Sequence, residues 1–161
     1  MTKLFAILLF VFNLQTPQMP EENMVDGKSI KVTNASGGSF GLGTPDDLQK
    51  AFGKAQIVTV ADEVLGGTSD YYRYKGLQVF FHDKKCELIT VKSPFFRFMI
   101  GGQTFKVGDN IAKLKALFPL SFKSKRDNFI RLGIKDADAW VAFTYNVNGL
   151  VTSIEVANDN S

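Results

Sequence analysis

The chain has 161 residues, of which 45% are hydrophobic, 22% charged and 12% aromatic, a composition typical of a folded domain and not of a disordered or collagen-like chain. The net charge of +3 is too small and too dispersed to indicate a nucleic-acid-binding surface. With one cysteine and one histidine, these residues can form neither an internal disulfide nor a zinc site of cysteine and histidine ligands.

The first residues have the pattern of a secretory signal peptide. Lys3 precedes an unbroken apolar run, Leu4 to Phe12, which has the length of a signal h-region and is too short to cross a bilayer as a helix. The polar residues that follow lack the pair of small residues of a cleavage site, and no cysteine offers a lipid anchor. We therefore expect a signal peptide at 1–18 with an undefined cut site, and export to the periplasm or the cell exterior without a membrane span. The alternative is a buried N-terminal strand or short helix.

After a polar lead-in, 19–28, the chain predicts a hairpin and a helix. The glycine pair Gly37-Gly38 separates two short β-like runs, as a tight hairpin requires. The helix is predicted at 44–53, because Thr44 can cap its start, a proline fits its first turn, and Gly53 supplies the end.

Three strands of alternating character follow this helix, at 71–74, 77–81 and 88–92, after a polar loop at 61–69. Cys86 lies near the start of the last strand. Nothing nearby except two lysines would lower the pKa of its thiol, so we interpret it as a half-buried bystander.

The second half repeats this order of elements. Its glycine pair is Gly101-Gly102, its helix is predicted at 109–119 with Asp109 as the cap and Pro119 as the end, and its strands are predicted at 129–132, 141–145 and 153–157. Gly43 and Gly108 are 65 residues apart, as are Ile89 and Ile154, whereas Tyr71 and Phe129 are 58 apart because the loop lengths differ. The sequence therefore predicts an α+β protein of two tandem units, 29–94 and 95–161, each with a hairpin, a helix and an antiparallel sheet, and with the helix packed on one sheet face.

This arrangement resembles the β-lactamase inhibitory proteins and the SmpA/OmlA-type small envelope domains. The resemblance spans Ile30 to Ala157 and rests on Gly-Thr or Gly-Asp before each helix, Phe52-Gly53 or Phe118-Pro119 at its end, and a closing strand after a polar turn. It implies an envelope or secreted binding module that uses an exposed sheet face without catalysis. The disulfides of the inhibitors and the lipobox cysteine of the lipoproteins are absent, so no functional residue is carried over.

Catalytic and metal-binding motifs are poorly represented. His82 is the one histidine and lies at the end of a predicted strand without a partner motif. Asp136 and Asp138 lie in a loop, but no calcium-binding loop of the EF-hand kind follows them. The glycines of Gly41-Leu42-Gly43 precede a helix without completing a phosphate-binding motif. We therefore expect no catalytic residue, metal or cofactor.

The alternation of the strands predicts an aromatic and basic sheet face. If Leu77, Val79 and Phe81 point into the core, their neighbours Gln78, Phe80 and His82 point outward. The same reasoning, applied to the other strands, gives an outward set with the composition of an interface hot spot, namely Tyr71, Arg73, Phe80, Phe129, Arg131 and Trp140. The alternative is that this face is covered by a second layer of the fold.

The sequence thus predicts an exported, non-enzymatic module that binds a protein or an envelope component through this face, with no nucleic-acid partner. Three alternatives stay open. The chain could be an immunity or inhibitor protein against a secreted enzyme or toxin, a hydrolase whose carboxylates converge only in the folded chain, or a structural envelope protein if the aromatic face is covered.

Overall fold

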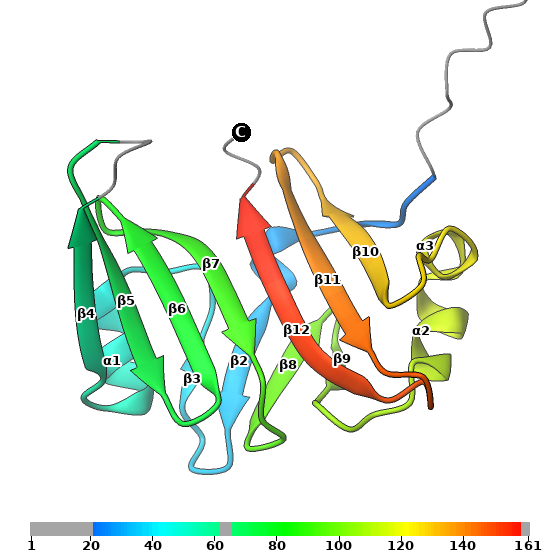
Figure 1. Ribbon diagram of the computed structural model, residues 1–161, viewed down its shortest axis with the longest axis horizontal. Coiled ribbons are helices and arrows are strands. Elements are labelled where there is room, and N and C mark those ends of the chain that lie inside the picture. The colour runs from blue at the N-terminus through cyan, green and yellow to red at the C-terminus, as the bar shows by residue number, and fades with distance from the viewer. Residues whose placement is uncertain (1–20, 62–65, 159–161) are drawn as a thin grey trace, which may run out of the picture.

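The computed structural model describes residues 21–61 and 66–158, and the predicted signal peptide at 1–18 lies outside these residues (Figure 1). In chain order the elements are β1 (Met24–Val25), the 3-10 helix η1 (Gly27–Ser29), β2 (Lys31–Asn34), β3 (Ser39–Phe40), α1 (Pro45–Phe52), β4 (Gln56–Ala61), β5 (Thr68–Tyr74), β6 (Leu77–His82), β7 (Lys85–Val91), β8 (Phe96–Ile100), β9 (Gln103–Phe105), α2 (Ala112–Leu117), α3 (Pro119–Lys123), β10 (Phe129–Ile134), β11 (Ala139–Tyr145) and β12 (Val151–Asn158). Among these elements there is no helix with both the length and the apolar character needed to cross a membrane.

The strands form two sheets. The large sheet has eight strands in the order β1-β10-β11-β12-β7-β6-β5-β4, and the small sheet has four in the order β3-β2-β8-β9. All neighbours pair antiparallel except β1 and β10, which are parallel. Both sheets are shared by the two halves of the chain, because β7 pairs with β12 in one and β2 with β8 in the other. The chain is therefore a mixed α and β fold with a continuous large sheet.

The hydrophobic core lies between the two sheets. Phe143 of β11 is fully buried, with its ring centroid 6.0 Å from Phe98 of β8 and 5.2 Å from Phe105 of β9. Phe40 of β3 and Phe81 of β6 make a similar contact between the sheets, with their ring centroids 6.3 Å apart. The predicted packing of a helix on one sheet face is found for α1, whose Phe52 ring centroid lies 5.9 Å from that of Tyr74 of β5 (Figure 1). The prediction did not include the small sheet, which packs on the inner face of the large sheet through the phenylalanine rings named above.

The first predicted helix is confirmed together with its end signals. Thr44 and Asp47 form a capping box, in which each side chain accepts a hydrogen bond from the backbone N–H of the other. The backbone N–H and the hydroxyl group of Thr44 both donate to Asp47 Oδ2, and these two hydrogen bonds lower the pKa of the Asp47 carboxyl group below its usual value. Gly53 follows with φ = 80°, a left-handed conformation that favours glycine at a helix end.

The second predicted helix differs at both ends. Helix α2 begins after Ile111 with no side-chain cap; Asp109 instead accepts a hydrogen bond from the backbone N–H of Lys106 and lies 2.9 Å from Nζ of Lys113. Pro119 does not end the helical segment. It is the first residue of α3, a position that a proline tolerates because its missing N–H would have no partner there.

Two strands at the ends of the large sheet have no counterpart in the sequence prediction. β4 is an edge strand of the large sheet and pairs with β5. It ends at Ala61, the first residue of the predicted loop. β1 lies inside the predicted polar lead-in and pairs Met24 with Gly133 and Val25 with Ile134. Within the lead-in, Met24 and Val25 are therefore part of the large sheet.

Candidate functional site

The face of the large sheet that points away from the small sheet carries the predicted aromatic and basic residues. The inward residues Leu77, Val79 and Phe81 are at most 2% exposed, which confirms the alternation inferred for β6. No layer of the described structure covers the opposite side (Figure 1). Of the six predicted residues, the two arginines are exposed and the four aromatic side chains are partly exposed, namely Tyr71, Arg73, Phe80, Phe129, Arg131 and Trp140. We call this surface the outer face.

The first group of these residues lies on β5 and β6. Tyr71 and Phe80 are register partners, and their ring centroids are 4.7 Å apart. The guanidinium carbon of Arg73 lies 6.0 Å from the centroid of the Tyr71 ring, at the limit of a cation–π contact. A hollow of about 300 Å³ lies beside Arg73, Gln78 and Thr90.

The second group lies on β10 and β11. The guanidinium carbon of Arg131 lies 5.8 Å from the centroid of the Trp140 ring, and a hollow of about 380 Å³ is lined by both side chains, by Phe129 and by Glu155. Arg126, which the sequence analysis did not select, places its guanidinium carbon 5.5 Å from the ring of Phe129. Arginine stacked on an aromatic ring is a common feature of protein interfaces.

The two groups are separated by the middle of the sheet. The register partners form one row across six strands, Arg73, Gln78, Thr90, Glu155, Ala142 and Arg131. Five strand spacings place the two arginine backbones about 24 Å apart, since neighbouring strands lie about 4.8 Å apart. The six predicted residues therefore make two sites on one face instead of a single cluster.

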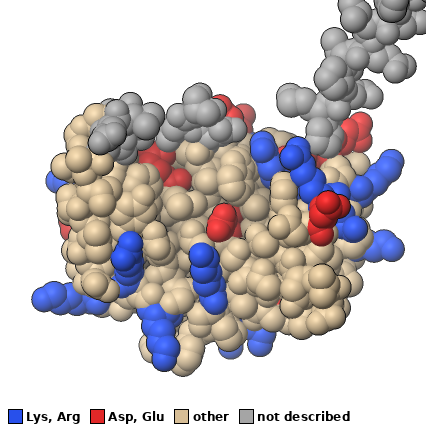
Figure 2. All heavy atoms as spheres, viewed as in Figure 1, with Lys and Arg blue, Asp and Glu red and all other residues tan. Residues whose placement is uncertain are grey.

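Glu155, like Arg126, is a functional candidate that the sequence patterns did not single out. It lies at the centre of the row, between the two arginine groups, and makes no ion pair with another described residue. The signal was present, because Glu155 is the outward residue between the buried Ile154 and Val156. Figure 2 shows the outer face in front, largely uncharged, with one acidic group near its centre and basic groups around it.

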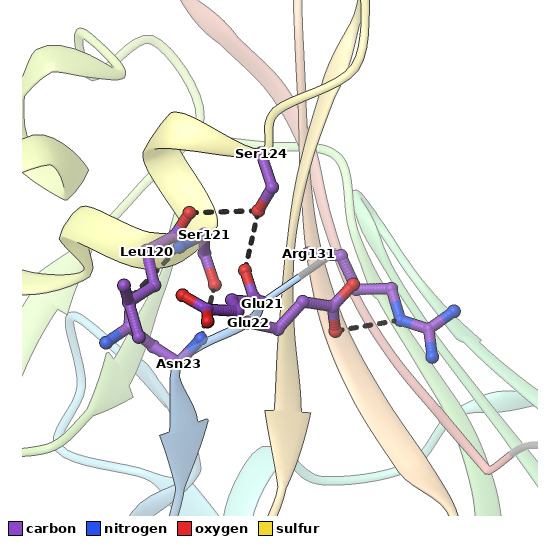
Figure 3. A network of polar contacts seen from close by, with 7 residues as sticks. All are labelled: Glu21, Glu22, Asn23, Leu120, Ser121, Ser124 and Arg131. Carbon is purple, nitrogen blue, oxygen red and sulfur yellow. Dashed lines mark hydrogen bonds and ion pairs between the residues drawn. The ribbon is translucent and has the colours of Figure 1, made fainter. Parts of the chain in front are cut away.

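The N-terminal segment borders the second group. Asn23 and Ser121 exchange two hydrogen bonds, from the Asn23 N–H to Ser121 Oγ at 2.8 Å and from the Ser121 N–H to Asn23 Oδ1 at 3.1 Å. The Ser124 hydroxyl group donates to the carbonyl oxygen of Glu21, and Glu22 Oε2 lies 3.3 Å from Arg131 Nε (Figure 3). The segment is thus held against both α3 and β10 and contributes a carboxylate to the edge of the outer face.

His82 lies near a serine and an aspartate, but the three residues do not form an accessible catalytic triad. Its Nδ1 lies 3.0 Å from Ser69 Oγ, and its Nε2 lies 3.7 Å from a carboxylate oxygen of Asp83. Ser69 is only 1% exposed, whereas a catalytic nucleophile must be reachable by its substrate. Ser69 and His82 therefore join the neighbouring strands β5 and β6 without offering an accessible nucleophile.

The remaining candidate residues lie apart from the outer face groups. Cys86 is a free, partly buried thiol, and desolvation together with the nearby Glu87 raises its pKa to about 12. Asp136 lies in the turn between β10 and β11 with φ = 56°. Among residues 21–61 and 66–158, no three histidine, cysteine or acidic side chains come together as metal ligands would.

Comparison with known proteins adds one weak structural similarity. No known family model and no curated protein matches the chain. Among solved structures, the chain is similar to an extracellular protein containing an SCP domain from Bacillus anthracis str. Ames, with a TM-score of 0.38 and 10% sequence identity. The match covers 73% of this chain and 43% of that chain, so the chain spans less than half of that protein's length. Similarity at this level does not establish a shared fold.

Proposed function

We propose that the chain is an exported, non-enzymatic binding module that recognises another protein through the outer face of its large sheet. The observation that carries this proposal is the presence of two arginine and aromatic groups on one uncovered face, each beside a hollow of 300 to 380 Å³. Aromatic residues and arginine dominate the energy of protein interfaces, and they do so best when a flat surrounding surface excludes water. The largely uncharged remainder of the face suits that role (Figure 2).

The charges along the row of register partners indicate which charges a partner surface would carry. Arg73 and Arg131 lie at the two ends of the row and Glu155 lies between them. A complementary surface would present acidic groups about 24 Å apart with a basic group between them. This spacing fits a folded protein surface, which includes a secreted enzyme or toxin that the chain would block.

We further infer that the two halves are a tandem duplication. In support, each half has a hairpin, then helical structure, then a meander that ends in a central strand of the large sheet. The two closing strands, β7 and β12, pair antiparallel, with Thr90 opposite Glu155 at the middle of the row. A duplication would explain why arginine stands at equivalent positions, 73 and 131, of the two halves.

The proposal is tested by affinity capture from the native secreted or envelope fraction, with the partner then purified for titration. Arg73→Ala combined with Arg131→Ala should leave the melting temperature nearly unchanged and weaken partner binding at least tenfold, since each hot-spot arginine contributes roughly 1 to 2 kcal/mol. The matched control is Arg97→Ala, because Arg97 is exposed on β8 of the small sheet. Equal binding by all three proteins would refute the proposal, and a large loss of stability in the double variant would show that these arginines are structural.

A further inference from the structure

A separate hollow of about 740 Å³ lies where η1, the loop between β3 and α1, and the turn between β10 and β11 meet. It shares no lining residue with the hollows of the outer face. Its volume is within the range of small-molecule sites in proteins. Because it is built by segments from both halves of the chain, only the assembled fold forms it.

The floor of this hollow is aliphatic. Ile30 and Ile134 line it and are 1% and 3% exposed, and Leu42, at its rim, is 43% exposed. No aromatic side chain lines it, so it has no ring on which a base or a sugar could stack. The lining therefore favours a flexible hydrocarbon group over a planar ligand.

Two glycines keep the hollow open. Gly27 and Gly41 line it, and neither has the positive φ that would require glycine. A Cβ atom at Gly27 would lie 3.2 Å from Ile134 Cγ2 and 3.9 Å from Leu42 Cδ1, within the aliphatic part of the lining. Larger side chains at these positions would fill the space.

Lysines surround the aliphatic floor. Lys28, Lys31 and Lys135 line the hollow, are exposed, and make no ion pair among the described residues. The two lining carboxylates are Asp26, which already accepts a hydrogen bond from the Lys28 N–H at 2.9 Å, and Asp136 in the turn. The positive side chains thus outnumber the negative ones, and none of them forms an ion pair with another residue that the structure describes.

From this combination we propose that the hollow binds a small aliphatic anion, that is, a carboxylate or phosphate group carried on a hydrocarbon chain. The lysine ammonium groups bind the anionic head, and the chain lies on Ile30, Ile134 and Leu42. Such a ligand exists as a free acid or as the headgroup end of a membrane lipid. The proposal does not depend on the outer face.

The test is a titration of the purified protein with sodium decanoate below its micelle concentration, followed by amide chemical shifts. We expect saturable shifts at Gly27, Leu42 and Lys135. Acetate, which lacks the chain, and 1-decanol, which lacks the charge, should each bind roughly tenfold or more weakly. Equal binding of 1-decanol, or shifts spread over the outer face, would overturn the proposal.

Matched variants locate the site. Lys28→Glu combined with Lys135→Glu should weaken decanoate binding roughly tenfold, whereas Lys115→Glu, on the exposed side of α2, should leave it unchanged. Gly41→Leu should also block binding while the chain folds, because the nearest atom to a Cβ there is the Ile30 carbonyl oxygen at 3.4 Å. Equal weakening by Lys115→Glu would refute the site, since it would indicate a general effect of net charge.

A second arm distinguishes the sources of the ligand. Co-sedimentation with phosphatidylglycerol vesicles that is lost in the Lys28→Glu and Lys135→Glu double variant assigns the site to lipid headgroups. Decanoate binding without vesicle binding assigns it to free aliphatic acids. Absence of both kinds of binding in a folded protein contradicts the proposal.

Discussion

Arg131 Nε lies 3.3 Å from Glu22 Oε2, so one of the two arginines of the outer face already has a carboxylate partner within the chain. The side chains are 44% and 22% exposed, and an ion pair of this exposure contributes at most about 1 kcal/mol to stability. Glu22→Gln should therefore lower the free energy of unfolding by less than about 1 kcal/mol. It should also strengthen partner binding, because an acidic partner no longer competes with Glu22 for Arg131.

Urea unfolding and calorimetric titration with the captured partner measure the two effects. Asp127→Asn is a control for the loss of one exposed negative charge nearby in the chain. If Glu22→Gln weakens binding as much as Arg131→Ala does, then the carboxylate itself contacts the partner and the assignment of Arg131 is wrong.

Phe143 joins the two sheets, and its removal tests whether they share one core. The side chain is fully buried and contacts Phe98 and Phe105 of the small sheet. Phe143→Ala should destabilise the protein by about 3 to 5 kcal/mol, as expected for the loss of a buried aromatic ring. The control Phe95→Ala removes a ring that is 71% exposed and should cost less than about 0.5 kcal/mol. Comparable losses in urea unfolding would show that the sheets are not packed as described.

Gly76 combines a positive φ with a close approach of a neighbouring side chain. Its φ is +88°, and an added Cβ would lie 2.1 Å from Cβ of Ser93. Gly76→Ala therefore combines left-handed strain of about 1 to 2 kcal/mol with a clash, and we expect a total cost of about 3 kcal/mol or more. The control is Gly37→Ala, because Gly37 has a similar φ of +85° but no atom within 4 Å of an added Cβ. This variant should lose only the stability that the left-handed strain costs. Equal midpoints for both variants in urea would contradict the clash.

The turns, the first helix and the strand faces were predictable because short-range rules decide them. Gly101 and Gly102 both have positive φ, which a two-residue hairpin turn of type I′ requires, whereas in the first glycine pair only Gly37 has positive φ. The capping box of Thr44 and Asp47 needs only residues three apart. The outward positions of Arg73 and Arg131 follow from alternation along single strands.

The pairing of strands from different halves was not predictable from local patterns. Asp109 satisfies the dipole and capping rules as a helix cap, yet β12 holds its backbone, since the Val151 N–H donates to the Asp109 carbonyl oxygen at 2.8 Å. The same limit applies to Met24 and Val25, whose parallel pairing with β10 depends on residues more than a hundred positions away. The position of Glu155 between the arginines also depends on this long-range register.

Cys86 gives a pH-dependent prediction. Because burial raises the pKa of the folded thiol to about 12, the unfolded chain loses this proton at lower pH than the folded chain does. The contribution to stability is therefore complete below about pH 8.5, the ordinary thiol pKa, and is lost as the pH rises toward 12, by at most about 1.4 kcal/mol per pH unit. Urea unfolding of the wild type should show a steeper decline in this range than unfolding of Cys86→Ala, which lacks the thiol.

The same pKa predicts low thiol reactivity. At pH 8 the folded protein should react with a disulfide reagent far more slowly than the urea-unfolded chain does. A rapid reaction of the folded protein would show that the Cys86 thiol is accessible and ionised, which would contradict its interpretation as a half-buried bystander.

β4 is the exposed edge of the large sheet, and it lacks the features that usually protect such an edge. Its six residues, Gln56 to Ala61, include no charge, proline or glycine, and Ile57 is 46% exposed. An uncharged, β-branched edge strand is a site for pairing with another chain. Ile57→Lys should therefore reduce concentration-dependent light scattering while it changes the free energy of unfolding by less than about 1 kcal/mol.

The control Ile57→Thr separates charge from hydrophobicity. Threonine keeps the branching that favours a strand and removes the apolar group without adding a charge, so it should reduce scattering less than lysine does. All three proteins share the same residues outside position 57, so a difference between them arises at this edge. Equal scattering by all three would place the self-association elsewhere in the chain and would show that β4 is not its starting point.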